Sequence, residues 1–159
     1  MRRTAVTGLF ARPVGVSAHV VIQAPVGAVW SELEHIDRHV SWMHDAVAIR
    51  FEGDQHRGLG TRFTCDTRVG PIRLSDQMEV TEWVEDRAIA VRHIGLVTGE
   101  GRFELVATSE DETRLSWNEQ LHFPAHFGGS LGALAARPVL TRIWQSSLFA
   151  LRRIVEASA

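Results

Sequence analysis

The hydrophobic and polar positions of this chain first alternate as in a β-strand, over residues 16–23 (VSAHVVIQ). Two short helices are predicted next. One begins near Pro25, which suits a first helical turn because its missing N–H would have no helical partner there, and ends at about Leu33. The other spans residues 36–43 (IDRHVSWM), and both are too short to be stable without packing against the rest of the protein.

From Asp45 to Phe123 the pattern has a period of two residues, which is typical of strands with one buried face. Short turns rich in glycine or acidic residues divide this region into the predicted strands AVAIRFEG, TRFTCDTRV, IRLSDQMEVTEWV, AIAVRHIG, GEGRFELVAT and TRLSWNEQLHF. Because the links have hairpin length, these six strands are expected to form an antiparallel meander.

The last segment, residues 130–156, has the spacing of a helix with one buried face. Its apolar stripe consists of Leu140, Trp144, Leu148, Leu151 and Val155. Ser130 fits an N-cap, and Pro138 is expected to kink the helix or to mark the start of its regular part. A sheet with one apolar face can bury that face by curling around this helix.

Together these segments resemble the helix-grip proteins of the START-like, or SRPBCC, superfamily, and within it the polyketide cyclase/dehydratase branch. The resemblance spans about residues 16–156 and is carried by VIQAPVGAVW, HIDRHVSWM, RGLGTRF, MEVTEW, GRFEL, TRLSW and RRIVE. It implies an α+β helix-grip fold, in which a curved antiparallel seven-stranded sheet wraps around a long C-terminal helix, with two short helices after the first strand. It also implies a cavity between sheet and helix for an apolar or aromatic small molecule.

Composition limits the chemistry that this chain can perform. All 17 basic residues are arginine, which excludes Schiff-base catalysis and a P-loop lysine, and the absence of tyrosine excludes a phenol as proton donor. The single cysteine, Cys65, excludes an internal disulfide and a multi-cysteine metal site, and it is interpreted as core filling. Scattered arginines and a formal net charge of −2 argue against a nucleic-acid partner.

The 159 residues indicate one ligand-binding domain, residues 16–159, preceded by a flexible segment, residues 1–15. No apolar run approaches the roughly 18 residues of a membrane span. The basic N-terminal stretch is too short and broken for a secretory signal. We therefore expect a cytoplasmic monomer or homodimer with a hydrophobic small-molecule ligand, no integral membrane association, no cofactor and no metal ion.

The apolar faces of the strands are assigned to the side that the long helix covers. This places Val47 inward and Trp83 on the opposite, solvent-exposed side. The residues expected to contact a ligand are Phe63, Met78, Val91, Gly101, Phe103, Trp117, Leu121, Trp144, Leu148 and Leu151. Large apolar residues at such positions are equally typical of a filled core.

Three ionisable residues, Asp76, His93 and Glu119, interrupt the apolar face. Directly opposed residues of an antiparallel pair point to the same side. A turn at residues 96–98 sets His93 opposite Gly101, and the next turn sets Gly101 opposite Glu119, which gives a row across three strands. The preceding hairpin sets Asp76 or Met78 opposite His93.

An imidazole and a carboxylate that meet over a glycine can act as a general acid–base pair. His93 and Glu119 are the candidate pair, with Asp76 in support. The alternative is that His93 and Glu119 only satisfy each other's hydrogen bonds. A single β-bulge would turn one of them to the other side of the sheet and remove the pair.

Two further motifs have simpler interpretations. GGSLG matches a nucleophile elbow, but neither His nor Asp follows Ser130, so loop glycines and an N-cap explain it better. His35, His39 and His44 have spacings compatible with a metal site, or with a polar helix face.

Three functional hypotheses remain open. The first is an enzyme of the cyclase/dehydratase type that acts on an aromatic or polyketide-like ligand. The second is a non-catalytic carrier or sensor of a lipid-like ligand. The third is an interaction module whose interior is filled by its own side chains, with Trp83 as a contact site.

Overall fold

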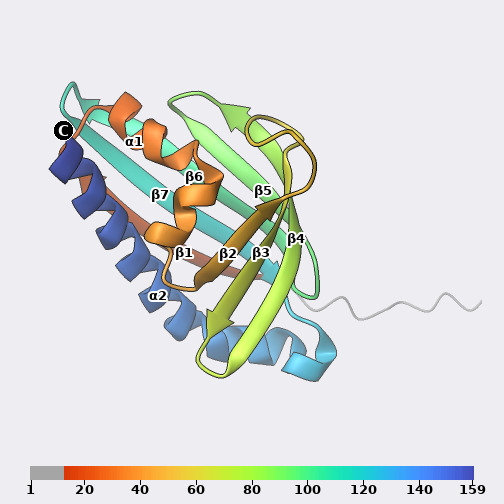
Figure 1. Cartoon of the computed structure of the whole chain (residues 1–159). Coiled ribbons are helices and arrows are strands. Elements are labelled where there is room, and N and C mark those ends of the chain that lie inside the picture. Colours follow the sequence, from red (N-terminus) through yellow and green to blue (C-terminus); the bar gives the residue numbers. More distant parts are fainter. Residues whose placement is uncertain (1–12) are drawn as a thin grey trace, which may run out of the picture.

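The structure, a computed structural model, describes residues 13–159 (Figure 1). Its elements are β1 (Val14–Ile22), α1 (Val26–Leu33), η1 (Ile36–Ser41), β2 (Ala46–Phe51), β3 (Arg62–Val69), β4 (Ile72–Val84), β5 (Ala88–Ile94), β6 (Thr98–Ser109), β7 (Glu112–His122), η2 (Ala125–Phe127) and α2 (Gly129–Ser158). Residues 1–12 of the expected flexible segment lie outside the described residues, and β1 begins two residues earlier than the predicted strand.

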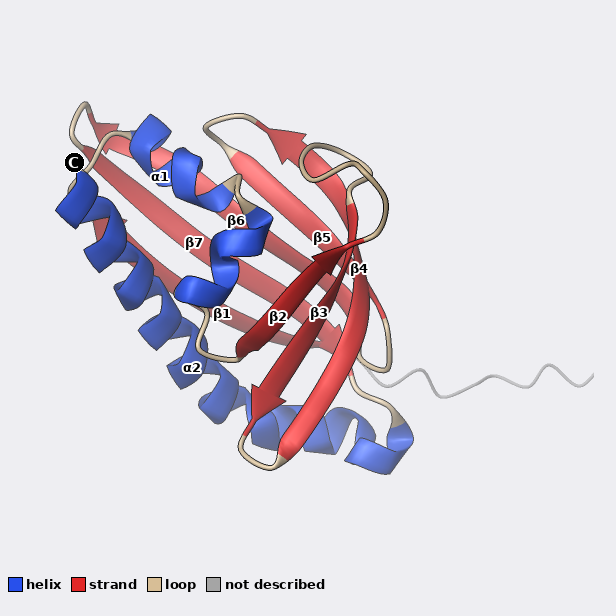
Figure 2. Cartoon of the chain, in the orientation of Figure 1, coloured by secondary structure: helices blue, strands red, loops and turns tan. Residues whose placement is uncertain are grey.

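The strands form one seven-stranded antiparallel sheet in the order β1-β7-β6-β5-β4-β3-β2. The predicted meander is therefore confirmed, and β1 closes it by pairing with the last strand, β7. The sheet curves, and α2 runs along its concave side from the η2 end toward α1 (Figures 1 and 2). This arrangement confirms the helix-grip α+β fold.

The interior is built from the apolar sides of the sheet and of the helices. Trp144, Leu148, Leu151 and Val155 of the predicted stripe are buried, whereas Leu140 nearer the start of α2 is only partly buried. Each fully buried side chain of this size stabilises the fold by about 1.5–3 kcal/mol. The short helix α1 buries Val29, Trp30 and Leu33, and this packing stabilises a helix that its length alone would not.

The beginnings of the helices differ from the predictions. α2 begins at Gly129 with Gly128 as its N-cap residue, so the prediction of Ser130 as N-cap is wrong. Gly128 has φ 84°, a left-handed conformation that favours glycine over any residue with a side chain. Pro138 lies inside the continuous α2, and Pro25 is the N-cap residue of α1 rather than its first helical residue.

Two bulges reverse the predicted orientation of two side chains. The register shifts between Ala46 and Ala48, and Val47 is 62% exposed. A second shift between Val80 and Glu82 turns Trp83 inward, where its ring meets that of Trp30 edge to face at 5.3 Å. Both predictions were wrong because one extra residue in a strand exchanges the two faces beyond it.

Neither α1 nor α2 has the continuous apolar length that a transmembrane helix requires, within the residues described.

Candidate functional site

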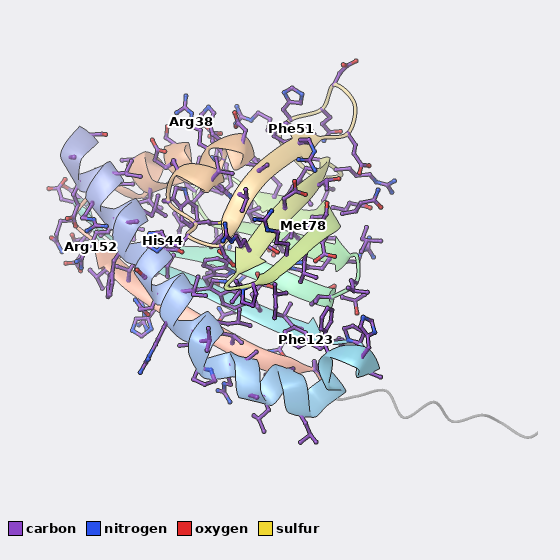
Figure 3. All side chains as sticks on the ribbon, turned by 60° about the horizontal axis from the view of Figure 1, so that its bottom comes forward. Arg38, His44, Phe51, Met78, Phe123 and Arg152 are labelled. Atoms are coloured by element: carbon purple, nitrogen blue, oxygen red, sulfur yellow. The ribbon has the colours of Figure 1, made fainter. Side chains whose placement is uncertain are left out.

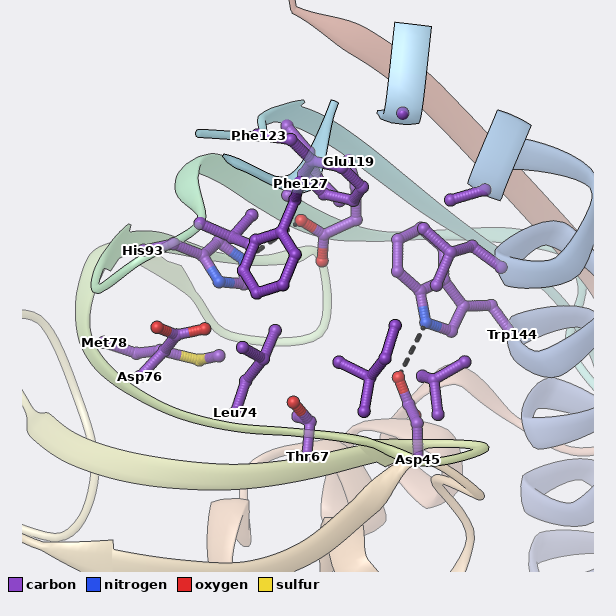
Figure 4. Close-up of a pocket in the computed structure, with 17 residues that line it drawn as sticks. Asp45, Thr67, Leu74, Asp76, Met78, His93, Glu119, Phe123, Phe127 and Trp144 are labelled. Atoms are coloured by element: carbon purple, nitrogen blue, oxygen red, sulfur yellow. Dashed lines mark hydrogen bonds and ion pairs between the residues drawn. The ribbon is translucent and has the colours of Figure 1, made fainter. Parts of the chain in front are cut away.

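A cavity with two adjoining chambers, which share lining residues, lies between the sheet and the first half of α2; Figure 4 shows the outer chamber. The outer chamber has a volume of about 240 Å³ and the inner chamber about 100 Å³. Both chambers are lined by Asp45, Thr67, Met78, His93, Glu119 and Trp144. In Figure 3 the side chains crowd the space between sheet and α2, whereas Arg38 and Arg152 lie at the periphery.

The outer chamber is bounded mainly by apolar side chains. The β3–β4 hairpin contributes Val69, Ile72 and Leu74, and Phe127 of η2 and Leu140 of α2 lie on the other side. Ile72 and Phe127 are 47% and 37% exposed, which marks this end of the cavity as its side nearest to solvent. The inner chamber lies deeper, among Ile36, Phe63, Phe103 and Trp117.

His93 and Glu119 meet where the two chambers join. Nε2 of His93 lies 3.1 Å from Oε2 of Glu119. Glu119 pairs with Gly101 as predicted, but His93 pairs with Gly99, so its predicted pairing with Gly101 is wrong by two residues. The reason is that Gly95, rather than Leu96, begins the β5–β6 turn; a shift of two residues leaves His93 on the same face.

Gly101 makes this contact possible, because a Cβ atom at this position would overlap the Glu119 carboxylate. Trp117 completes the group by donating its indole N–H to Oε1 of Glu119 at 2.8 Å. Both oxygens of a carboxylate that is only 4% exposed are thereby hydrogen-bonded. Burial lowers the pKa of His93, but the hydrogen bond and charge of Glu119 outweigh it, so this pKa lies above its ordinary value.

Asp76 holds the turn that precedes β6. Its Oδ1 accepts a hydrogen bond of 2.8 Å from the backbone N–H of Leu96, and a Cβ atom on Gly95 would overlap its side chain. Asp76 itself pairs with Cys65 on β3, and its neighbour Met78 lies opposite His93, one of the two predicted pairings. The carboxylate is 5% exposed and lines the outer chamber.

Asp45 belongs to the same cavity and was missed by the sequence analysis as a member of it. Its Oδ2 accepts a hydrogen bond of 3.1 Å from the indole N–H of Trp144 (Figure 4). Trp144 in turn stacks on Trp117, with ring centroids 4.8 Å apart and planes inclined by 22°. Burial raises the pKa of Asp45. The sequence offered one signal for this position: Asp45 is an acidic residue directly before β2, a strand that ends on the apolar Phe51.

Comparison with known proteins identifies the family. The sequence model of the family described as polyketide cyclase/dehydrase and lipid transport matches residues 13–156. The chain belongs to this family. A comparison with curated protein sequences gives no match.

Solved structures of similar fold agree with this membership. TTHA0849 from Thermus thermophilus has a TM-score of 0.78 at 17% identity, over 92% of this chain and 99% of that one. The Zhui aromatase/cyclase from Streptomyces sp. R1128 has a TM-score of 0.67 at 14% identity, over 92% and 93%. The di-domain ARO/CYC StfQ from the steffimycin biosynthetic pathway has a TM-score of 0.76 at 14% identity, over 93% of this chain and 52% of that one. At these identities the likeness establishes the shared fold.

In this polyketide cyclase/dehydrase family member, most of the expected ligand contacts line the cavity. Met78 and Trp144 line both chambers, and Leu121 lines the outer one. The inner chamber is lined by Phe63, Val91, Gly101, Phe103 and Trp117. Leu148 and Leu151 line neither chamber; both are fully buried in the core beneath α2.

The remaining candidates from the sequence of this family member are the histidine-rich segment, Cys65 and GGSLG. His39 is buried and donates a hydrogen bond from Nε2 to the carbonyl of Leu33 at 2.8 Å, and burial lowers its pKa to about 4. Burial also raises the pKa of the Cys65 thiol to about 12. Among residues 13–159, no three His, Cys, Asp or Glu side chains gather as metal ligands. GGSLG lies at the start of α2, after an antiparallel strand.

Proposed function

We propose that this protein binds a hydrophobic, aromatic or polyketide-like molecule in the two-chambered cavity and catalyses its cyclisation or dehydration by acid–base chemistry. The observation that carries the proposal is the position of the His93–Glu119 pair, which lines both chambers. A ligand that extends from the outer into the inner chamber passes this pair. Membership of the polyketide cyclase/dehydrase family supports the same class of reaction.

The proposed dehydration needs only a proton donor and acceptor. Neutral His93 removes a proton from the carbon between a carbonyl and a hydroxyl-bearing carbon, and Glu119 stabilises the imidazolium that forms. The same imidazolium then protonates the hydroxyl group, the C–O bond breaks, a C=C bond forms and water leaves. His93 returns to its neutral form, and no oxidant or reductant is consumed.

A second function, a carrier or sensor of a lipid-like ligand, is favoured by a different observation. Trp117, Glu119 and His93 already satisfy one another through hydrogen bonds, as a purely structural group would. The family description includes lipid transport. An interaction module with a filled interior receives no support, because the described residues enclose open volume and Trp83 packs inward.

Native mass spectrometry of the purified protein, beside a denatured sample, is the first test. A mass excess that is lost on denaturation identifies a bound small molecule. Turnover is then measured with that molecule and with a β-hydroxy aryl ketone, whose dehydration product absorbs in the near ultraviolet. We expect His93→Gln and Glu119→Gln to abolish turnover and to leave the ligand dissociation constant within about threefold.

His19→Gln is the matched control, because His19 is an exposed histidine on β1 outside both chambers. It is expected to keep full turnover. If the two cavity variants also keep full turnover, the enzymatic proposal is wrong and the carrier function stands. If neither a co-purified molecule nor any added apolar ligand binds, both functions are wrong.

A further inference from the structure

The outer chamber contains more carboxylates than basic groups. Asp45, Asp76 and Glu119 line it, and His93 is the one basic side chain among the described residues of its lining. Arg102 lies beside the inner chamber, but its guanidinium group is paired with Glu82 and Glu104 at 2.7 and 3.2 Å. His93 is hydrogen-bonded to Glu119. Among the described residues, Asp45 and Asp76 therefore form no ion pair, although the charge of Asp76 contributes to raising the pKa of His93.

The hydrogen bonds of these two carboxylates come from neutral groups. Asp45 accepts from the indole of Trp144, and Asp76 accepts from the backbone N–H of Leu96. The hydrogen bond from Leu96 reaches Oδ1 of Asp76, and the Asp76 side chain lines the outer chamber. Only 5% of Asp76 is exposed, so solvent compensates this charge poorly.

A negative potential in a poorly solvated cavity favours a bound cation and disfavours an anion. Burial, followed by the charges of Asp45, Asp66 and Asp76, raises the pKa of the neighbouring Cys65 thiol to about 12. Trp144 lines the same chamber, and tryptophan rings attract cations.

We propose that the ligand of this cavity is a cationic amphiphile: an apolar, aromatic body that carries an amine or ammonium group, with the cationic group bound in the outer chamber against Asp76. Asp45 and Glu119 strengthen the potential at this position. The inference rests on the proposed function, since it requires that the cavity binds a small molecule. It further implies that carboxylate ligands, such as fatty acids, are rejected.

The test uses three probes with the same apolar body and different charge: naphthylmethylamine, naphthylmethanol and naphthoic acid. Their dissociation constants are measured by isothermal titration calorimetry at pH 7, where the amine is cationic and the acid anionic. We expect the amine to bind about tenfold more tightly than the alcohol or better, and the acid to bind most weakly.

Three variants test whether the preference for the amine arises from the carboxylates of the outer chamber. Asp76→Asn keeps the oxygen that accepts from Leu96 and removes the charge, so it is expected to abolish the preference for the amine while the alcohol binds as before. Asp45→Asn keeps the acceptor for Trp144 and is expected to reduce the preference. Asp66→Asn is the control, because this carboxylate is paired with Arg50 at 2.7 Å and lines neither chamber.

The possible outcomes separate the two proposals. Alcohol binding with an equal or weaker amine overturns the cationic ligand and leaves the cavity proposal standing. The same holds if Asp76→Asn leaves the amine preference unchanged. If none of the three probes binds and no molecule co-purifies, the proposed function fails and the cationic ligand fails with it.

Discussion

Nε2 of His93 on β5 and Oε2 of Glu119 on β7 lie 3.1 Å apart although a whole strand, β6, runs between their backbones. Antiparallel neighbours are about 4.8 Å apart, so the two backbones are separated by roughly twice that distance. The side chains span this gap because Gly101, which pairs with Glu119, presents no side chain between them. The geometry of the pair therefore depends on one glycine in the middle strand.

Gly101→Ala is expected to break the pair. The added Cβ overlaps the Glu119 carboxylate, which must move away from His93. We expect a loss of about 1–3 kcal/mol in the free energy of unfolding, measured by urea denaturation. Gly27→Ala is the control, because Gly27 lies on α1 with its nearest neighbouring atom at 3.8 Å from the new Cβ. An equal effect of the two substitutions would contradict the role of Gly101.

The raised pKa of His93 predicts a pH-dependent stability. The unfolded imidazole titrates near pH 6.5. The stabilisation by the imidazolium–Glu119 contact is therefore fully present below that pH and is lost as the pH rises through the higher folded-state pKa. The difference in unfolding free energy between the wild type and His93→Gln should shrink from pH 6 toward pH 9.

His39, whose pKa is lowered to about 4, is present in both proteins and cancels from this comparison. NMR titration of the histidine ring protons provides a direct check. In Glu119→Gln, burial without the carboxylate should bring the His93 pKa below its wild-type value. If the difference in unfolding free energy between the wild type and His93→Gln instead grows with pH, the predicted direction of the His93 pKa shift is wrong.

The indole N–H of Trp117 is expected to contribute to stability, whereas that of Trp42 is not. Trp117 donates to Glu119 at 2.8 Å, but the buried Nε1 of Trp42 has no hydrogen-bond partner in the described structure. Both tryptophan-to-phenylalanine substitutions remove similar volume. We expect Trp117→Phe to cost about 1–3 kcal/mol more than Trp42→Phe in urea denaturation, because it leaves a buried carboxylate oxygen without its donor. Equal costs would show that this hydrogen bond adds nothing.

Cys65 is expected to be unreactive in the folded protein. It is 5% exposed, and its thiol pKa is raised to about 12. Because the thiolate is the reactive form, alkylation by iodoacetamide at pH 8 should be at least about a hundredfold slower than in urea. Mass spectrometry of timed samples measures both rates. Rapid stoichiometric labelling of the folded chain would contradict the predicted burial of this thiol.

Local patterns were sufficient to predict the elements and much of their pairing. Period-two segments located every strand, and the pairing of Gly101 with Glu119 followed from parity and turn length. The errors came from single residues: the bulges near Val47 and Trp83, and the start of the β5–β6 turn. A bulge has no hydrophobic signature of its own, because it is defined by two residues of one strand opposing a single residue of the partner strand.

The sequence by itself determined the order of the elements, the helix-grip architecture and the inward face that holds Asp76, His93 and Glu119, because the period of the pattern dictates which side chains share a face. Only the tertiary structure decided which inward residues line open volume. Trp144 borders the cavity while Leu148, one helical turn later, is in the core. The hydrogen bond from Trp144 to Asp45 joins residues 99 positions apart. Such contacts depend on the curvature of the sheet and on the place where α2 crosses it, and neither is encoded in local spacing.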